Sequence, residues 1–526
     1  MSWEPPGTRP TDTATWSAGT DVLAAAPAEE PARRASWWLV GGAAALALAL
    51  VGGVTYGVGA LSGGGSQPED ALPAGAFGFA KVDLDPSAAQ KIDGFRFLRK
   101  FPALRDKLGG GEDLRKLAFE AVADGAGWSD VDFDAEVSPW MGKRIGFAAY
   151  PPEKTDDPFP DPTVVVALQV EDESAAKDGL DRLADLEAGS GQPGSRLGFV
   201  VTGDYALLAE TQALADRAAR DAEAGVLAED ANLTSDLGAL GDGVAAAWVD
   251  MNRAVEAVGP AALQMGSLAG VVGGVGGAGG RSAYVARFDG PDVFEVAGRV
   301  VGAETAGWAS HPVEGVAQLP ESSVVAFGLA DGDELVNRLY ETLRTAYEKG
   351  GPEQGMPPFE DMVAQAEAGL GIEIPEDVAS LLGDNLVGAL DGGKSGTVQL
   401  GARVRTDVAR AERVLDLLTS GDAGDFVLAR ERVGDELVVA STPAQAARLA
   451  AGGTLGDRPG FRDAMADLDN ADLAVWLDIV GLSETLFPSR EGGPVDENMA
   501  PIEGLGVTAS SRDEGTGTFR VRLVAR

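Results

Sequence analysis

The apolar residues after residue 72 fall into short runs bounded by Gly, Asp or Pro, and this pattern predicts strands. TVVVALQV at 163–170 and RSAYVARF at 281–288 are rich in β-branched and aromatic residues, as strands are. LGFVV and YALLAE are separated by Thr202-Gly203-Asp204, which predicts a hairpin. Helical patterns lie between the runs. We therefore expect an α+β fold with a mostly antiparallel sheet covered by helices.

The stretch KVDLDPS predicts a junction between a strand and a helix. We expect a strand over residues 77–84, Asp85 as the helix N-cap and Pro86 as the first helical residue, where its missing N–H costs nothing. Pro102 should end this helix. The side chains expected to be buried on it are Ile92, Phe95, Leu98 and Phe101.

A second junction of the same kind occurs at Ala-Asp331-Gly-Asp333-Glu. It retains an acidic cap but changes the spacing of the two acids. A catalytic dyad would need a fixed separation, so we interpret Asp83 and Asp85 as strand end and helix cap. The helix that follows should have one buried face, formed by Leu335, Val336, Leu339, Tyr340 and Leu343.

Seven segments of the first half recur in the same order in the second half, which indicates an internal duplication. Leu72 and Leu319 begin the first pair, 247 residues apart, and Phe294 and Phe519 the last, 225 apart. The separation falls almost steadily, as loop shortening after duplication would produce. We predict tandem copies of one α+β unit over 72–301 and 319–526, with a linker over 302–318. The other matched pairs are Phe119/Phe359, Gly142/Gly383, Thr163/Thr397, Gly203/Gly434 and Asp250/Asp478.

The N-terminal region predicts a membrane anchor. Residues 37–61 contain no charged side chain and are long enough to span a bilayer. Arg33 and Arg34 precede them, which places the N-terminus in the cytoplasm. We expect a disordered tail (1–35), a transmembrane helix (36–61), a linker (62–71) and an extracytoplasmic remainder. A signal peptide cleaved after Ala60 is the alternative.

Small residues recur every fourth position along the predicted spanning helix, and this spacing favours close pairing of two helices in lipid. The helix could therefore mediate a homodimer, although so many Ala and Gly residues also give this spacing by chance. The residues concerned are Gly41, Ala45, Ala49, Gly53 and Gly57.

Composition excludes several classes of function. The net charge of −40 repels nucleic acid. The chain has no Cys and one His, so thiolate chemistry, disulfides, Cys-ligated zinc and multi-His metal sites are excluded. We interpret the one histidine, His311, as an ordinary loop residue.

Three stretches fit chemical motifs formally, but each has the wrong context. The phosphate-loop pattern from Gly388 to Ser395 precedes a predicted strand instead of a helix, and so does the GxGxxG pattern from Gly274 to Gly279. The alternating acids from Asp130 to Glu136 lack the glycine of a calcium loop and are better explained as a helix start. We predict no catalytic, cofactor-binding or metal-binding residue and no cofactor.

The chain resembles an uncharacterised domain-of-unknown-function family of single-pass membrane proteins from high-GC Gram-positive bacteria. The resemblance is most specific over ALPAGAFGFAKVDLDPSAAQKIDGFRFLRKFP, residues 71–102. It implies the membrane topology given above and no activity, substrate or catalytic residue.

These observations predict a membrane-anchored extracytoplasmic binding or scaffolding module of the cell envelope, without catalysis. The alternative is a carboxylate-based hydrolase of envelope glycan, because Asp and Glu are plentiful. Two carboxylates about 5–10 Å apart in a pocket would favour that enzyme.

Overall fold

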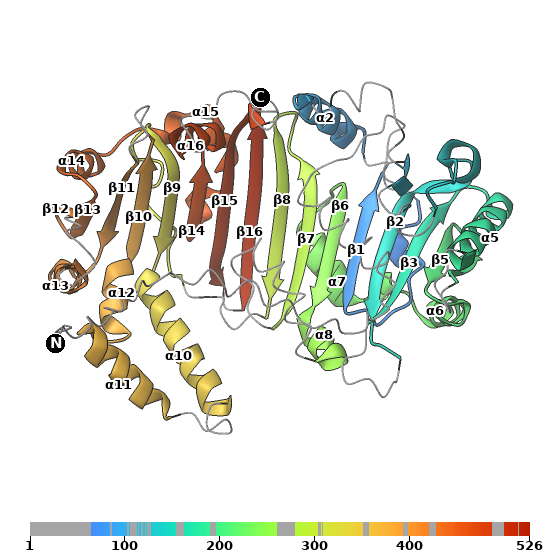
Figure 1. Cartoon of the computed structure of the whole chain (residues 1–526), viewed down its shortest axis with the longest axis horizontal. Helices are drawn as coiled ribbons and strands as arrows, with labels where there is room; N and C mark the ends of the chain where they lie inside the picture. The colour runs from blue at the N-terminus through green and yellow to red at the C-terminus, as the bar shows by residue number, and fades with distance from the viewer. Residues whose placement is uncertain are drawn as a thin grey trace, which may run out of the picture.

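The computed structural model shows one antiparallel sheet of 16 strands that runs through the whole molecule (Figure 1). Its strand order is β12-β13-β11-β10-β9-β14-β15-β16-β8-β7-β6-β1-β2-β3-β5-β4. The structure describes residues 65–84, 87–102, 105, 113, 115–116, 119–120, 123, 128–153, 162–189, 196–259, 279–302, 307, 309–350, 357–392, 398–419, 428–486, 499–513 and 515–526.

The strands are β1 (Gly78–Asp83), β2 (Met141–Tyr150), β3 (Thr163–Val170), β4 (Gly198–Thr202), β5 (Tyr205–Ala209), β6 (Ala245–Asp250), β7 (Arg281–Phe288), β8 (Val293–Val301), β9 (Ser323–Ala330), β10 (Asn385–Asp391), β11 (Gln399–Arg405), β12 (Ala429–Val433), β13 (Glu436–Ala440), β14 (Leu473–Leu477), β15 (Ile502–Asp513) and β16 (Thr516–Ala525). The helices are α2 (Ala88–Leu98), α5 (Glu173–Gly189), α6 (Gln212–Ala224), α7 (Ala231–Gly238), α8 (Met251–Val258), α10 (Gly332–Gly350), α11 (Phe359–Leu370), α12 (Glu376–Leu382), α13 (Val408–Thr419), α14 (Pro443–Ala451), α15 (Pro459–Ala464) and α16 (Ile479–Leu486).

Starting from the central pair β8 and β16, equivalent strands of the two halves follow one another in the same order towards both edges of the sheet. On one side the order is β8, β7, β6, β1, β2, β3, β5 and β4. On the other side it is β16, β15, β14, β9, β10, β11, β13 and β12. The central pair β8 and β16 is antiparallel, with Val296 opposite Val521. Equal orders are what the predicted duplication would produce, and we treat residues 72–301 and 319–526 below as the first and second halves.

The predicted fold class is wrong about the sheet. We expected each half to have its own sheet, but pairing of β8 with β16 joins all strands into one. In addition, within the described ranges no helix is long and apolar enough to cross a membrane. The predicted spanning segment 36–61, its small-residue positions from Gly41 to Gly57, and the predicted tail 1–35 lie outside the described residues.

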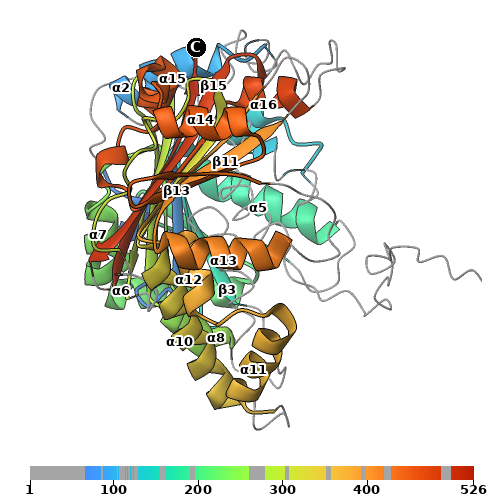
Figure 2. The ribbon, with the colours of Figure 1, turned by 90° about the vertical axis from the view of Figure 1, so that its left-hand side faces the viewer.

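Helices cover both faces of the sheet, as Figure 2 shows edge-on. On the face that we call face A, Phe97 and Leu98 of α2 pack with Ala286 and Phe288 of β7. On the opposite face B, Ala218 of α6 and Leu233 of α7 join a core around Trp248. The second half repeats the face B arrangement with α14 and α15 around Trp476. Alternation of side chains along each strand separates the two cores.

Trp248 and Trp476 lie at matching places in the two halves and are both 0% exposed. The indole N–H of Trp248 donates to Asp236 at 3.0 Å, whereas among the described side chains that of Trp476 has no partner. We expect Trp248→Phe to lower the free energy of unfolding by about 1–2 kcal/mol more than Trp476→Phe, because only the first loses a buried hydrogen bond. Urea unfolding of both variants tests this, and equal losses would contradict it.

The buried face of helix α2 is only partly the one predicted, because Leu98 is buried as expected but Ile92 is not. Its buried residues are Lys91, Gly94, Phe97 and Leu98, while Ile92 is 51% exposed. Gly94 permits this orientation, because a Cβ there would lie 2.8 Å from the ring of Phe288. The N-cap is Ser87, which accepts from the Gln90 N–H, and the predicted cap Asp85 lies outside the described residues.

The largest difference between the halves concerns the helix after the first strand. Helix α2 follows β1 and lies on the sheet, whereas α10, which follows β9, extends away from the end of the sheet together with α11 (Figures 1 and 2). We call α10 and α11 the arm. The predicted buried face of α10 is therefore wrong at two positions, because Leu339 is 45% and Leu343 63% exposed.

Candidate functional site

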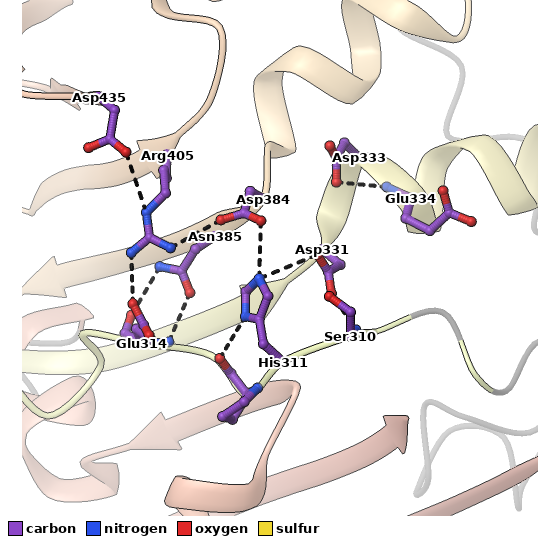
Figure 3. A network of polar contacts seen from close by, with 11 residues as sticks. Ser310, His311, Glu314, Asp331, Asp333, Glu334, Asp384, Asn385, Arg405 and Asp435 are labelled. Atoms are coloured by element: carbon purple, nitrogen blue, oxygen red, sulfur yellow. Dashed lines mark hydrogen bonds and ion pairs between the residues drawn. The ribbon is translucent and has the colours of Figure 1, made fainter. Parts of the chain in front are cut away.

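A network of polar side chains lies at the base of the arm, where three segments meet (Figure 3). His311 comes from the segment before β9, Asp331 from the junction of β9 with α10, and Asp384 from the junction of α12 with β10. We call these three residues the His311 cluster. Within the described ranges it is the one place where three His or acidic ligand atoms lie within 4.8 Å of one another.

The imidazole of His311 lies between the two carboxylates. Its Nε2 is 3.1 Å from Oδ1 of Asp384 and 3.3 Å from Oδ1 of Asp331. Its Nδ1 is 3.0 Å from the carbonyl oxygen of Pro312. The side chain of Asp331 is 12% exposed, that of His311 30% and that of Asp384 44%, so solvent reaches one side of the cluster.

Further contacts fix the outer edge of the network. Arg405 at the end of β11 donates to Oδ2 of Asp384 at 3.0 Å and to Glu314 at 2.7 Å. Asn385 exchanges two hydrogen bonds with the backbone of Glu314, at 2.8 and 3.1 Å. These bonds hold the segment before β9 against the ends of β10 and β11.

The network shifts the ionisation of its members. The hydrogen bond to the Pro312 carbonyl raises the pKa of His311, and the carboxylates of Asp384 and Asp331 raise it further against the effect of burial. Burial raises the pKa of Asp384, but hydrogen bonds from His311 and Arg405 outweigh it and lower the pKa below 3.8. Opposite charges at contact distance favour both charged forms.

Asp331 directly precedes α10, but its side chain faces away from the helix start. It has φ of 45°, a left-handed conformation that non-glycine residues rarely adopt. Its carboxylate accepts from the N–H and the hydroxyl of Ser310 and faces His311. At the start of α10, the carboxylate of Asp333 accepts from the N–H of Glu334 at 2.8 Å.

Of the two acids that we interpreted as strand end and helix cap, the structure describes Asp83. Asp83 pairs with Arg144 of the adjacent strand at 3.2 Å, while Asp85 lies outside the described residues. Arg144 also donates to the backbone of Ser66 at 3.2 Å. This contact corresponds to that of Asn385 with Glu314, so both halves secure the segment before their first strand in a similar way.

The two glycine-rich patterns lie beside strands. β10 ends at Asp391 and pairs antiparallel with β11, which begins at Gln399, so a strand follows the phosphate-loop pattern, as predicted. Its Gly393, Lys394 and Ser395 lie outside the described residues, as do Gly274 and Gly276 of the GxGxxG pattern. A phosphate loop needs a helix at this position.

The alternating acids around Asp132 form a capped helical turn, as the sequence predicted. The Asp132 side chain accepts from the N–H groups of Asp134 and Ala135 at 3.0 and 3.2 Å. Asp134 then pairs with Lys116 and Glu136 with Arg182. These contacts occupy the carboxylates that a calcium loop would direct at one ion.

A cavity of about 150 Å³ lies where the halves meet. Its lining includes Arg287, Arg520, Thr508, Ser510 and one carboxylate, that of Asp467. Asp467 forms an ion pair with Arg520. Two carboxylates facing the cavity would be needed for glycoside hydrolysis, so its lining does not support the predicted alternative enzyme.

Sequence reasoning missed the His311 cluster because its members lie far apart in the chain. One signal was present. The matched pair Gly142 and Gly383 aligns Lys143 with Asp384, so the second half has an acid where the first has a base. This departure from the repeat indicates a local interaction specific to the second half, and the structure shows that it is with His311.

Comparison with known proteins gives one match. Residues 39–195 match the family model described as "Protein of unknown function (DUF3352)". No curated protein and no solved structure matches the chain. The match supports the expected resemblance to an uncharacterised family whose biochemical function is unknown. It covers part of the first half and does not reach the His311 cluster. The membrane topology and the bacterial group stay predictions.

Proposed function

We propose that the chain is a non-catalytic scaffolding protein that binds a helical protein partner between the arm and face A of the second half. The observation that carries the proposal is the different position of equivalent helices in the two halves. In the first half α2 covers face A, and in the second half α10 leaves it. Location in the cell envelope, with an extracytoplasmic bulk and no nucleic-acid partner, stays a prediction from the sequence.

The second half exposes apolar side chains on this surface. On face A, Phe327 of β9 is 38% and Leu400 of β11 51% exposed. In the first half, by contrast, Phe119 packs with Trp128, Phe133 and the strand residue Val166 in one core. Exposed apolar groups that lie together mark interaction sites.

The arm adds a second apolar wall. Phe359 at the start of α11 packs against Tyr340 and Tyr347 of α10, which leaves the remaining apolar face of the arm open. Its exposed residues are Leu339 (45%), Leu343 (63%), Met362 (36%) and Leu370 (55%).

The apolar surface continues from the arm onto α13. A Cβ on Gly371 would lie 4.0 Å from Leu417 of α13, and both Leu417 and Leu418 are exposed. An amphipathic helix that enters a groove of this kind contacts it through residues at i, i+3, i+4 and i+7.

The charges of the arm indicate which kind of helix fits. Helix α10 carries four acids and three bases, and α11 carries three acids and no base. A partner with basic flanks is therefore favoured, and a second copy of the same acidic arm is disfavoured. The first half supplies an internal example, because α2 and its flank, sequence KIDGFRFLRKF, combine Phe and Leu with Lys and Arg.

A peptide of residues 87–102 is therefore a suitable probe. We expect the full chain to bind this labelled peptide, measured by fluorescence anisotropy, and Leu343→Ser with Leu370→Ser to weaken binding at least tenfold through lost apolar contact. The matched control is Ile92→Ser, which removes a similarly exposed apolar side chain from the first half. Equal binding by both variants, or no binding by the wild type, would contradict the proposal.

A further inference from the structure

We propose that the His311 cluster binds one divalent first-row transition-metal ion through Nε2 of His311 and Oδ1 of Asp331 and Asp384. This departs from the expectation that the chain has no metal site. It does not depend on the proposed partner, because the cluster lies at the base of the arm and not on its exposed apolar surface.

The orientation of the imidazole is the first argument. A carbonyl oxygen accepts hydrogen bonds and cannot donate them, so Nδ1 of His311 carries the proton that is donated to the Pro312 carbonyl. The lone pair of Nε2 in the neutral imidazole then points at two carboxylate oxygens, at 3.1 and 3.3 Å. A cation must lie among these three acceptors, and it is either a proton on Nε2 or a metal ion.

The two distances from Nε2 to the carboxylate oxygens are those of ligands around a metal ion. Ligand atoms bonded at about 2.1 Å and separated by 90–110° lie about 3.0–3.4 Å apart. Nε2 is 3.1 Å from one carboxylate oxygen and 3.3 Å from the other, and all three ligand atoms lie within 4.8 Å of one another.

The outer contacts of the ligands are the third argument. Oδ2 of Asp331 accepts from the N–H and hydroxyl of Ser310, and Oδ2 of Asp384 accepts from Arg405. Each carboxylate is thus held through one oxygen and directs the other at Nε2. Metal ligands are typically fixed by such outer hydrogen bonds, with His donating its second N–H to a carbonyl.

The donor set selects the ion. One imidazole with two carboxylates suits Zn²⁺, Co²⁺, Ni²⁺, Fe²⁺ or Mn²⁺, whereas Ca²⁺ and Mg²⁺ prefer oxygen ligands alone. Three protein ligands with one solvent-facing side leave further coordination positions to water. The ion would join the segment before β9 to the ends of β9 and β10 and so fix the base of α10.

The test uses the one histidine of the chain, whose imidazole C–H resonances need no assignment among others. We expect Co²⁺ added to the chelator-treated full chain to shift these resonances at one equivalent, and Zn²⁺ to compete with it. Asp331→Asn and Asp384→Asn should each weaken Co²⁺ binding at least tenfold. The control Asp185→Asn removes a carboxylate that is 73% exposed and should bind as wild type does.

Two results would overturn the metal site. One is that the histidine resonances stay unshifted through several equivalents of Co²⁺, which would assign the cluster to an imidazolium ion pair. The other is that both Asn variants bind Co²⁺ as tightly as wild type, which would place the ion elsewhere on the acidic surface. Circular dichroism before metal addition establishes whether each variant is folded. If one Asn variant is unfolded, the other Asn variant provides the test.

Discussion

Glu295→Gln is expected to lower the free energy of unfolding by about 3–5 kcal/mol, because it removes the carboxylate of a buried ion-pair network. Glu295 lies on β8 and is 1% exposed. It accepts from Arg287 at 2.9 Å and forms an ion pair with Arg522 of β16, whose side chain is 8% exposed. Without this carboxylate, the buried Arg522 keeps an ion pair with Asp289 and a hydrogen bond to the Asp463 carbonyl at 2.8 Å, but loses its buried anion.

The position of Glu295 gives the variant a further consequence. Arg522 is opposite Glu295 in the pairing of β8 with β16, so the loss falls on the contact between the halves. The matched control is Glu173→Gln, which breaks an exposed pair with Lys177 and should cost less than about 1 kcal/mol. Equilibrium unfolding in urea compares the two. Similar losses in both variants would show that the central network does not stabilise the sheet.

Asp377→Asn is expected to lower the free energy of unfolding by about 2–3 kcal/mol at pH 7, since hydrogen bonds to a buried charge are lost. Asp377 lies on α12 and its side chain is 0% exposed. Its oxygens accept from Arg410 at 2.6 Å, from Arg413 at 2.7 Å and from the N–H of Glu373 at 2.9 Å. The side-chain amide of the Asn variant has an NH₂ group in place of one carboxylate oxygen, and this group cannot accept a hydrogen bond from the donor that faces it.

The effect of Asp377 depends on pH in a defined direction. Burial raises the pKa of Asp377, but hydrogen bonds from Glu373 and Arg410, with the charge of Arg413, outweigh it and lower the pKa below 3.8. A lowered pKa means that the stabilisation is present above the unfolded value of about 3.9 and is lost as pH falls through the folded value.

The difference in stability between wild type and Asp377→Asn should therefore be constant above about pH 5 and shrink below pH 3.8. Thermal unfolding across this range measures it. Asp416→Asn, at a carboxylate that is 72% exposed, should show little difference at any pH. A difference for Asp377→Asn that does not change with pH would rule out the carboxylate charge as its source.

Local patterns predicted the strands well because a strand depends on its own sequence. RSAYVARF is β7, and the hairpin at Gly203 joins β4 to β5. Which strands become neighbours is a different question. Val293–Val301 and Thr516–Ala525 are both rich in apolar residues, and nothing in either stretch specifies that β8 and β16 pair. The single sheet was therefore not predictable from these segments.

The helices show the same limit. The spacing around Leu339 and Leu343 predicted an apolar face correctly, but not that this face would be exposed. In α2 the choice between Ile92 and Phe97 as the buried residue depends on Gly94, which lets the helix approach the ring of Phe288. Such close approaches depend on the partner element, which periodicity does not reveal.

The most direct test of the proposed function is hydrogen–deuterium exchange of the full chain with and without the peptide of residues 87–102. The peptide should slow amide exchange in α10, α11 and β9, because a bound helix would cover the arm and the exposed part of face A around Phe327. The same peptide should leave α5 and α6 of the first half unchanged. Protection confined to the first half, or no protection in the arm, would contradict the assignment of this surface as a docking site.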